Sequence, residues 1–130
     1  MAMPIHFLDR STLAFAIDPD APPRLEVAAP CEVMIETHDA RSGKLRRPED
    51  EAMTAPVFTD RFPKTNPATG PVRVVGAAPG DALVVEVLRI DLDDQGFVMV
   101  KPDAGLLTGL VNQTETKVLP VRDGLVHFGH

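Results

Sequence analysis

Proline and glycine interrupt this sequence at short intervals, and their spacing limits the regular structure that the chain can form. There are 13 prolines and 9 glycines among the 130 residues. A proline inside a helix removes a backbone hydrogen-bond donor and clashes with the preceding turn, so closely spaced prolines prevent long helices. The sequence therefore disfavours an all-α bundle and favours short strands joined by turns.

Segments rich in β-branched residues lie between these interruptions, and their hydrophobic side chains recur with the period of two that is typical of strands. Aromatic residues make up only 5% of the chain, so Val, Leu, Ile and Ala must form the core. We expect a mostly β fold, a sandwich or barrel-like domain with little helix, formed by residues 1–130 as a single domain. The expected strands are residues 24–27, 31–38, 71–76, 82–92, 96–100, 116–121 and 125–128.

Three connections between these strands have the composition of turns. Residues 78–81 read Ala-Pro-Gly-Asp and residues 122–124 read Arg-Asp-Gly, so each contains a glycine that can take the positive φ of a tight turn. Residues 93–96 form a third candidate hairpin, which would close the strand 82–92 onto residues 97–100. The first half of the strand 82–92 is apolar on both faces, which predicts a central strand between two packing layers.

The stretch from residue 40 to residue 68 shows neither a strand pattern nor a helix pattern. An irregular connection of this length is uncommon in a compact domain unless it is a functional loop, a lid or an interface segment. A disordered loop is the alternative, although it would leave Val57, Phe58 and Phe62 in water. A proline followed by acidic residues predicts one short helix in this stretch, at residues 48–53.

Four polar residues, Glu36, Thr37, His38 and Asp39, follow the apolar part of the expected strand 31–38. Polar groups at the end of an apolar face need partners. One interpretation is a functional site, with two carboxylates, a hydroxyl and an imidazole where the strand opens onto the long loop. The other is local: Thr37 and Asp39 hydrogen-bond the start of that loop, as Asp does in Asx-turns. Residue spacing by itself favours the local interpretation.

Charge and cysteine content restrict the partners and the compartment. With a net charge of −6 and no Lys/Arg stripe, the chain lacks the basic surface that nucleic acid and anionic membranes require. Its single cysteine, Cys31, cannot form an internal disulfide, and the sequence shows neither a leader peptide nor an apolar run of 18 residues. We therefore expect a cytoplasmic protein that binds neither nucleic acid nor a membrane.

The residue spacing indicates no cofactor. His6, His127 and His130 have none of the spacings of a metal site, which gives little support to zinc binding by this chain alone or to an independent small metalloenzyme. A G-x-S-x-G elbow, a P-loop and a Rossmann fingerprint are also missing from the sequence.

The most specific run in the chain spans residues 66–83 and reads NPATGPVRVVGAAPGDAL. It resembles a stretch of the acetamidase/formamidase family, in which Asn or His precedes Pro-x-Thr-Gly-Pro, a short strand, Gly-Ala-x-Pro-Gly-Asp and a hydrophobic strand. Residues 36–40, Glu-Thr-His-Asp-Ala, resemble the family's Glu-Thr-x-Asp-Ala element, and residues 105–107, Gly-Leu-Leu, resemble its later Gly-x-Leu. Essentially all 130 residues can be aligned with the N-terminal part of that family.

The resemblance implies an amide hydrolase. Members of the family hydrolyse small linear amides such as formamide and acetamide to the carboxylate and ammonia, and some hold a metal. Amide hydrolysis needs a base or metal that activates water, donors for the oxyanion and an acid for the leaving ammonia. The resemblance assigns the carboxylate to Glu36 or Asp39 and a polar contact to His38 or Asn66, so Glu36, His38 and Asp39 are the candidate catalytic residues.

The candidate substrate-binding residues are Asn66, Thr69 and Gly70. Pro67 and Pro71 bracket the Thr69–Gly70 turn, in which glycine can take positive φ and present backbone N–H groups. Asn66 lies at the mouth of that turn. Such a turn can position a substrate amide.

This sequence departs from the family in two ways. Many members have a Pro-Gly turn where this chain has Pro30-Cys31, and members are about twice this long or more. We therefore expect an amidohydrolase subunit or fragment that belongs to an oligomer and needs a second polypeptide or a C-terminal half to complete its site. A divalent metal, zinc or calcium, would be shared with that half. The alternative is a non-catalytic β-rich binding or assembly module derived from the family.

Overall fold

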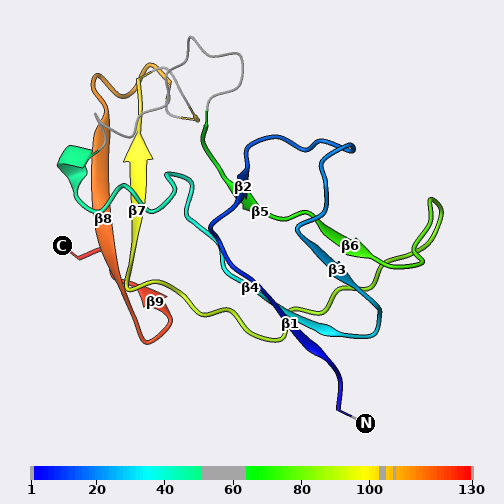
Figure 1. Cartoon of the computed structure of the whole chain (residues 1–130). Coiled ribbons are helices and arrows are strands. Elements are labelled where there is room, and N and C mark those ends of the chain that lie inside the picture. The colour runs from blue at the N-terminus through cyan, green and yellow to red at the C-terminus, as the bar shows by residue number, and fades with distance from the viewer. Residues whose placement is uncertain (1, 51–63, 103–104, 107, 130) are drawn as a thin grey trace. The chain divides into compact units, whose positions relative to one another are not determined.

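The structure is a computed structural model that describes residues 2–50, 64–102, 105–106 and 108–129 (Figure 1). Strands form almost all of the regular structure in these residues, and the helical part is a single 3-10 turn, η1. The prediction of a mostly β fold with little helix is confirmed. The elements are β1 (Ile5–Leu8), β2 (Leu13–Ala14), β3 (Leu25–Val27), β4 (Glu32–Ile35), η1 (Pro48–Asp50), β5 (Ala68–Thr69), β6 (Val72–Val74), β7 (Gln95–Val100), β8 (Glu115–Arg122) and β9 (Leu125–Val126).

The described residues divide into two compact units. The first comprises residues 2–43 and 64–85, and the second comprises residues 44–50 and 86–129 apart from the gaps at 103–104 and 107. The prediction that residues 1–130 form one domain stays a prediction. Among the described residues, no helix is both long enough and apolar enough to cross a bilayer.

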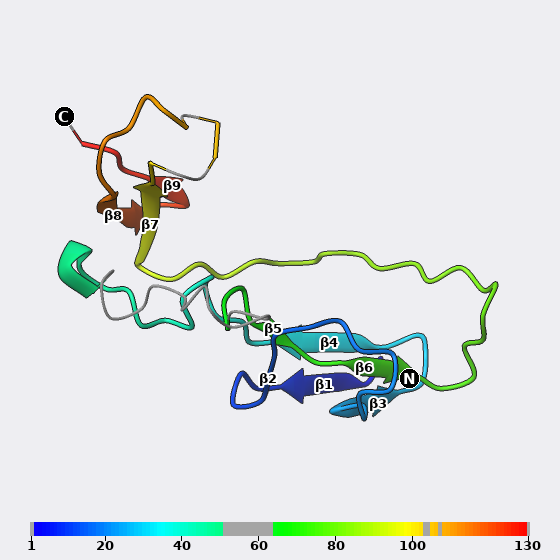
Figure 2. The ribbon, with the colours of Figure 1, turned by 90° about the horizontal axis from the view of Figure 1, so that it is seen from above.

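The first unit holds three two-stranded sheets (Figure 2). β1 pairs with β4 and β3 pairs with β6, both in parallel, whereas β2 pairs with β5 in antiparallel orientation. Two parallel strands need a long connection between them, so each of the two parallel pairs joins segments that are distant in the sequence. The predicted strands 24–27, 31–38 and 71–76 are confirmed with shorter bounds. β1, β2 and β5 were not predicted, and β2 and β5 are only two residues long.

The second unit is built on a three-stranded antiparallel sheet in the order β7-β8-β9. The predicted strands 96–100 and 116–121 are confirmed, and β9 covers the first two residues of 125–128. Asp123 and Gly124 join β8 to β9 with φ values of 52° and 72°. Two consecutive positive φ angles give the turn whose twist matches a two-residue hairpin, so the predicted hairpin at 122–124 is also confirmed.

Hydrogen bonds to one carboxylate hold residues 44–50 in place. Asp50 Oδ2 accepts hydrogen bonds from the backbone N–H groups of Arg46 at 3.0 Å and Arg47 at 2.9 Å. Leu45, which is 1% exposed, and Leu119 are the largest fully buried side chains among the described residues. η1 begins at Pro48 as predicted, and the rest of the predicted helix, residues 51–53, lies outside the described residues.

The prediction of a central strand at 82–92 is wrong. The structure assigns no strand to these residues, and no described strand pairs with them. Seven hydrophobic side chains of the segment are instead 61–91% exposed. The apolar residues are present in this segment. A strand also needs a partner that accepts and donates its backbone hydrogen bonds, and none of the described residues supplies one.

The predicted hairpin at 93–96 is also wrong. β7 begins at Gln95 and pairs with β8, not with the segment before it. Asp93 and Asp94 instead accept hydrogen bonds from the guanidinium of Arg46, at 2.6 Å and 2.9 Å. These two charge-assisted contacts fix the start of β7 against residues 44–50.

The carboxylate of Asp50 makes the stability of this region dependent on pH. The backbone N–H of Arg46, aided by that of Arg47, lowers the pKa of Asp50 below its ordinary value of 3.8. A lowered folded-state pKa contributes stability that is complete above the unfolded pKa and is lost as the pH falls through the folded value. We expect Asp50→Asn to lower the thermal unfolding midpoint at pH 7 by several degrees, and the difference from wild type to shrink below about pH 4.

Thermal unfolding of both proteins between pH 3 and pH 8 checks this expectation. Glu49→Gln is the matched control, because Glu49 is the exposed neighbour of Asp50. A deficit of Asp50→Asn that is the same at pH 3 and pH 7 would contradict the role assigned to the carboxylate.

Candidate functional site

The structure brings the two family-like motifs of the sequence together within the first unit. The hydroxyl of Thr69 donates a hydrogen bond of 2.7 Å to the backbone carbonyl of Glu36, 33 positions earlier in the chain. The backbone N–H of Asn66 donates a hydrogen bond of 3.0 Å to the carbonyl of Ala40. The segment that follows β4 and the turn around β5 are therefore neighbours, joined at both ends.

Backbone geometry shapes the turn that contains the candidate substrate-binding residues. Asn66 has a φ of 53°, a left-handed conformation that asparagine tolerates better than most residues, and Gly70 has a φ of 138°, where glycine is favoured. Between them, Thr69 of β5 pairs with Leu13 of β2. The positive φ predicted for Gly70 is confirmed, and the glycine is buried.

Asp39 forms the local turn that residue spacing favoured. Its Oδ1 accepts hydrogen bonds from the backbone N–H groups of Arg41 at 2.7 Å and Gly43 at 3.0 Å, and its carbonyl accepts one from the N–H of Ser42. This is an Asx-type arrangement, in which the side chain satisfies the start of the loop. One oxygen of Asp39 is therefore committed to holding the backbone.

Glu36 is held differently. Its backbone N–H continues the β1–β4 ladder by donating to the carbonyl of Leu8, while its side chain is exposed. Among the described residues, the backbone N–H of Arg10 donates a hydrogen bond of 3.4 Å to Oε2 of Glu36, which is close to the limit for such a bond. Of the two candidate carboxylates, Glu36 is the one with more capacity left for a ligand.

His38 is half-buried and lies over the same loop. A Cβ placed on Gly43 would come within 3.3 Å of His38 Nδ1, so the ring is close to the Gly43 backbone. Gly43 itself has a φ of 71°. The ring position thus depends on the loop that Asp39 organises.

Sequence reasoning missed Arg10, Leu13 and Gly43, because no local pattern links them to these motifs.

The described residues do not form a metal centre on their own. Within residues 2–50, 64–102, 105–106 and 108–129, no group of three or more His, Cys, Asp or Glu side chains could hold a metal ion. Zinc and calcium sites in proteins use several such ligands. A metal at Glu36, His38 or Asp39 would therefore need ligands from outside these residues.

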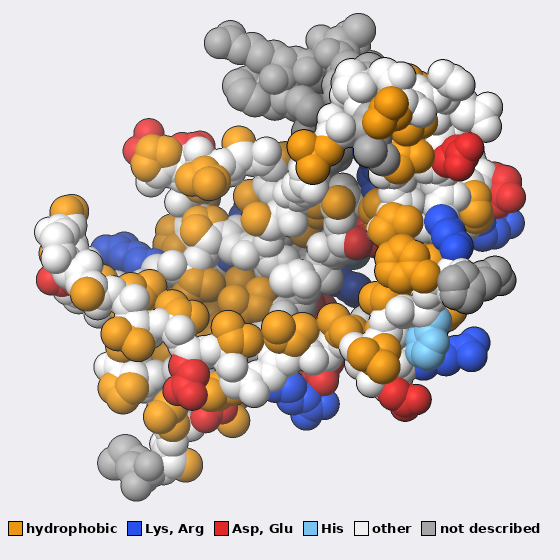
Figure 3. All heavy atoms as spheres, turned by 180° about the vertical axis from the view of Figure 1, so that it is seen from behind, with side chains coloured by type: hydrophobic (Ala, Val, Ile, Leu, Met, Phe, Trp, Pro, Cys, Tyr) orange, Lys and Arg blue, Asp and Glu red, His pale blue; other side chains and the backbone are white. Residues whose placement is uncertain are grey.

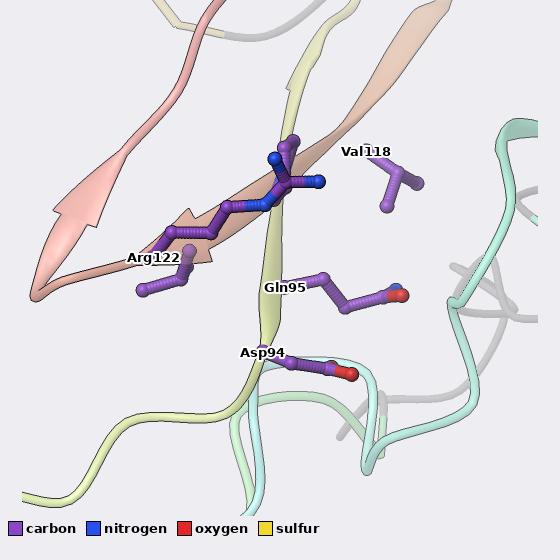
Figure 4. Close-up of a pocket in the computed structure, with 6 residues that line it drawn as sticks. Asp94, Gln95, Val118 and Arg122 are labelled. Carbon is purple, nitrogen blue, oxygen red and sulfur yellow. The ribbon is translucent and has the colours of Figure 1, made fainter.

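A surface hollow of about 390 Å³ lies in the second unit, beside β7 and β8 (Figure 4). Asp94 and Gln95 extend into this region from the start of β7, and Arg122 reaches it from β8. The Asp94 carboxylate already accepts a hydrogen bond from Arg46, and Gln95 donates one to the Arg46 carbonyl. None of the candidate site residues lines this hollow.

A protein-family model matches most of this sequence. The model of the acetamidase/formamidase family matches residues 10–125, which include both motifs. The chain belongs to the acetamidase/formamidase family. No curated protein matches this family member in sequence.

Solved structures of the family agree with this membership. An acetamidase from Bacillus halodurans is 29% identical over 95% of this chain, with a TM-score of 0.82. A protein described as a predicted acetamidase/formamidase, from the thermophile Thermoanaerobacter tengcongensis, is 29% identical over 98% of this chain, with a TM-score of 0.84. This family member spans only 40% and 41% of the lengths of those two chains.

Proposed function

We propose that this chain is part of an amidohydrolase that converts a small linear amide, of the formamide or acetamide kind, to a carboxylate and ammonia. The observation that carries the proposal is the contact between the two family motifs, made by the Thr69 hydroxyl and the Glu36 carbonyl at 2.7 Å. The family length that this chain does not cover would complete the site, as a second polypeptide of a cytoplasmic oligomer or as the C-terminal part of a longer chain.

In this proposal the Glu36 carboxylate is the general base. It takes a proton from a water molecule whose oxygen attacks the amide carbon, and then gives that proton to the amide nitrogen, so that the C–N bond breaks and ammonia leaves. The acid that forms loses its remaining proton to solvent and becomes the carboxylate. The turn from Asn66 to Gly70 positions the amide, and His38 is a polar contact to it. Asp39 holds the loop, because one of its oxygens already accepts two backbone N–H groups.

A non-catalytic binding or assembly module derived from the family is the second candidate. The observation that favours it is that Asp39, one of the two candidate catalytic carboxylates, holds the backbone of the loop. Such a module would keep the fold without the chemistry.

Ammonia release from formamide and acetamide tests the proposal. The chain is assayed alone and after co-expression with a complementary polypeptide. The complementary polypeptide is the product of an adjacent gene that carries the remaining family sequence. Where there is no such gene, it is the part of the Bacillus halodurans acetamidase that this chain does not cover. We expect no activity from the chain alone and activity from the pair. A pair that assembles and releases no ammonia would favour the non-catalytic module.

A further inference from the structure

The segment from residue 82 to residue 92, here named the 82–92 segment, carries large exposed hydrophobic side chains at seven of its eleven positions. Figure 3 shows that hydrophobic side chains are exposed on the face of the molecule drawn there. The exposed fractions are Leu83 65%, Val84 91%, Val85 75%, Val87 71%, Leu88 65%, Ile90 72% and Leu92 61%. Single exposed apolar residues are ordinary, but seven of them close together in the chain mark an interaction site.

The backbone of the 82–92 segment is available as well. Figures 1 and 2 draw it without an arrow between β6 and β7, and no described strand is hydrogen-bonded to it. The contact given within it is a side-chain ion pair of 2.7 Å between Arg89 and Asp91, both exposed. Unpaired N–H and C=O groups along an extended apolar run are a template for another strand.

The alternation of side chains shows what kind of partner the 82–92 segment needs. Leu83, Val85 and Val87 lie on one face of an extended chain, and Val84, Leu88 and Ile90 lie on the other. Glu86, Arg89 and Asp91 interrupt these two faces, but most positions on both are apolar, as in a strand inside a sheet that is covered on both sides. A second copy, pairing edge to edge through the same segment, would make a two-stranded ribbon whose two faces remain in water.

The share of the solved family chains that this chain covers points to the occupant. This family member spans 40–41% of the two solved family chains that it matches, so more than half of their length lies outside it. That remainder is large enough to supply both neighbouring strands and covering layers.

We infer that the 82–92 segment is the strand onto which the remaining part of the family fold assembles. In the assembly its backbone pairs with strands of that part, and its two apolar faces are covered. This inference rests on the part of the proposed function that requires a complementary polypeptide, and not on the chemistry.

Hydrogen–deuterium exchange of the full chain, alone and with the complementary polypeptide, tests the inference. In the chain alone we expect the amides of residues 84–92 to exchange close to the rate of an unstructured peptide. In the pair we expect their exchange to slow by about 100-fold or more. The amides of Val118, Leu119 and Val121 in β8, whose residues are already paired, serve as the internal reference.

Two variants separate specific docking from nonspecific hydrophobic association. Val87→Pro removes an N–H within the 82–92 segment and should weaken binding of the complementary polypeptide by about 100-fold or more, without unfolding a chain in which no described residue is shown to pair with that group. Val87→Lys is the second variant and should have the same direction of effect. The matched control is Ile17→Lys, because Ile17 is fully exposed outside the segment and its change should leave binding within about two-fold.

The outcomes are distinct. Slow exchange at 84–92 in the chain alone would overturn the inference, as would a homodimer that protects these amides, failure of the complementary polypeptide to bind, or binding that leaves them unprotected. Protection in the pair supports the inference even when no ammonia is released, and in that case only the proposed function fails.

Discussion

Glu36→Gln is expected to lower kcat for amide hydrolysis in the assembled enzyme by about 100- to 10,000-fold, the range that a positioned general base contributes. The Glu36 carboxylate is exposed, and its contact from Arg10 is at the weak limit of 3.4 Å. Glutamine keeps the size of the side chain and an oxygen acceptor but cannot take the proton. The free energy of unfolding should change by no more than about 0.5 kcal/mol, as for a surface substitution.

Asp39→Asn provides the contrast. Both of its backbone donors, Arg41 and Gly43, lose a charged acceptor, so this variant should unfold more readily than wild type. Kinetics with formamide and acetamide, together with urea unfolding of each variant, measure both effects. Should Glu36→Gln retain full activity while Asp39→Asn loses it without any change in stability, the roles assigned to the two carboxylates would be reversed.

Gly70→Ala is expected to destabilise the first unit by about 1–3 kcal/mol, the cost of holding a residue with a side chain in a sparsely populated backbone conformation. Gly70 has a φ of 138° and is buried. Space does not cause the effect, because the nearest atom to an added Cβ, the backbone nitrogen of Val72, is 3.6 Å away, an ordinary contact. Since Gly70 follows Thr69, activity of the assembled enzyme should fall as well.

Urea unfolding measures this loss, and Gly96→Ala is the matched control. Gly96 lies in β7 with no positive φ and nothing within 4 Å of an added Cβ. Alanine there should be neutral or stabilising by up to about 1 kcal/mol, since it reduces the freedom of the unfolded chain. Equal destabilisation by the two substitutions would contradict the assignment of strain to Gly70.

Part of the candidate site could be predicted because local chemistry encodes it. Asp39 binds backbone groups two and four positions away, and Gly70 takes the positive φ that its place in the turn requires. The partner of Thr69 could not be predicted in the same way. Its hydroxyl donates a hydrogen bond to the carbonyl of Glu36, 33 positions earlier, and no residue pattern in either segment identifies the other as its partner.

Local sequence alone determined the mostly β character of this chain, the hairpin at Asp123–Gly124 and the Asx-type turn at Asp39, because each depends on the φ preferences and hydrogen bonds of a few adjacent residues. Tertiary structure decided the parallel pairing of β1 with β4 and of β3 with β6. It also decided that residues 82–92 have no strand partner among the described residues. The apolar pattern of that segment states only that it should be covered, whereas a strand forms where another backbone supplies the complementary hydrogen bonds.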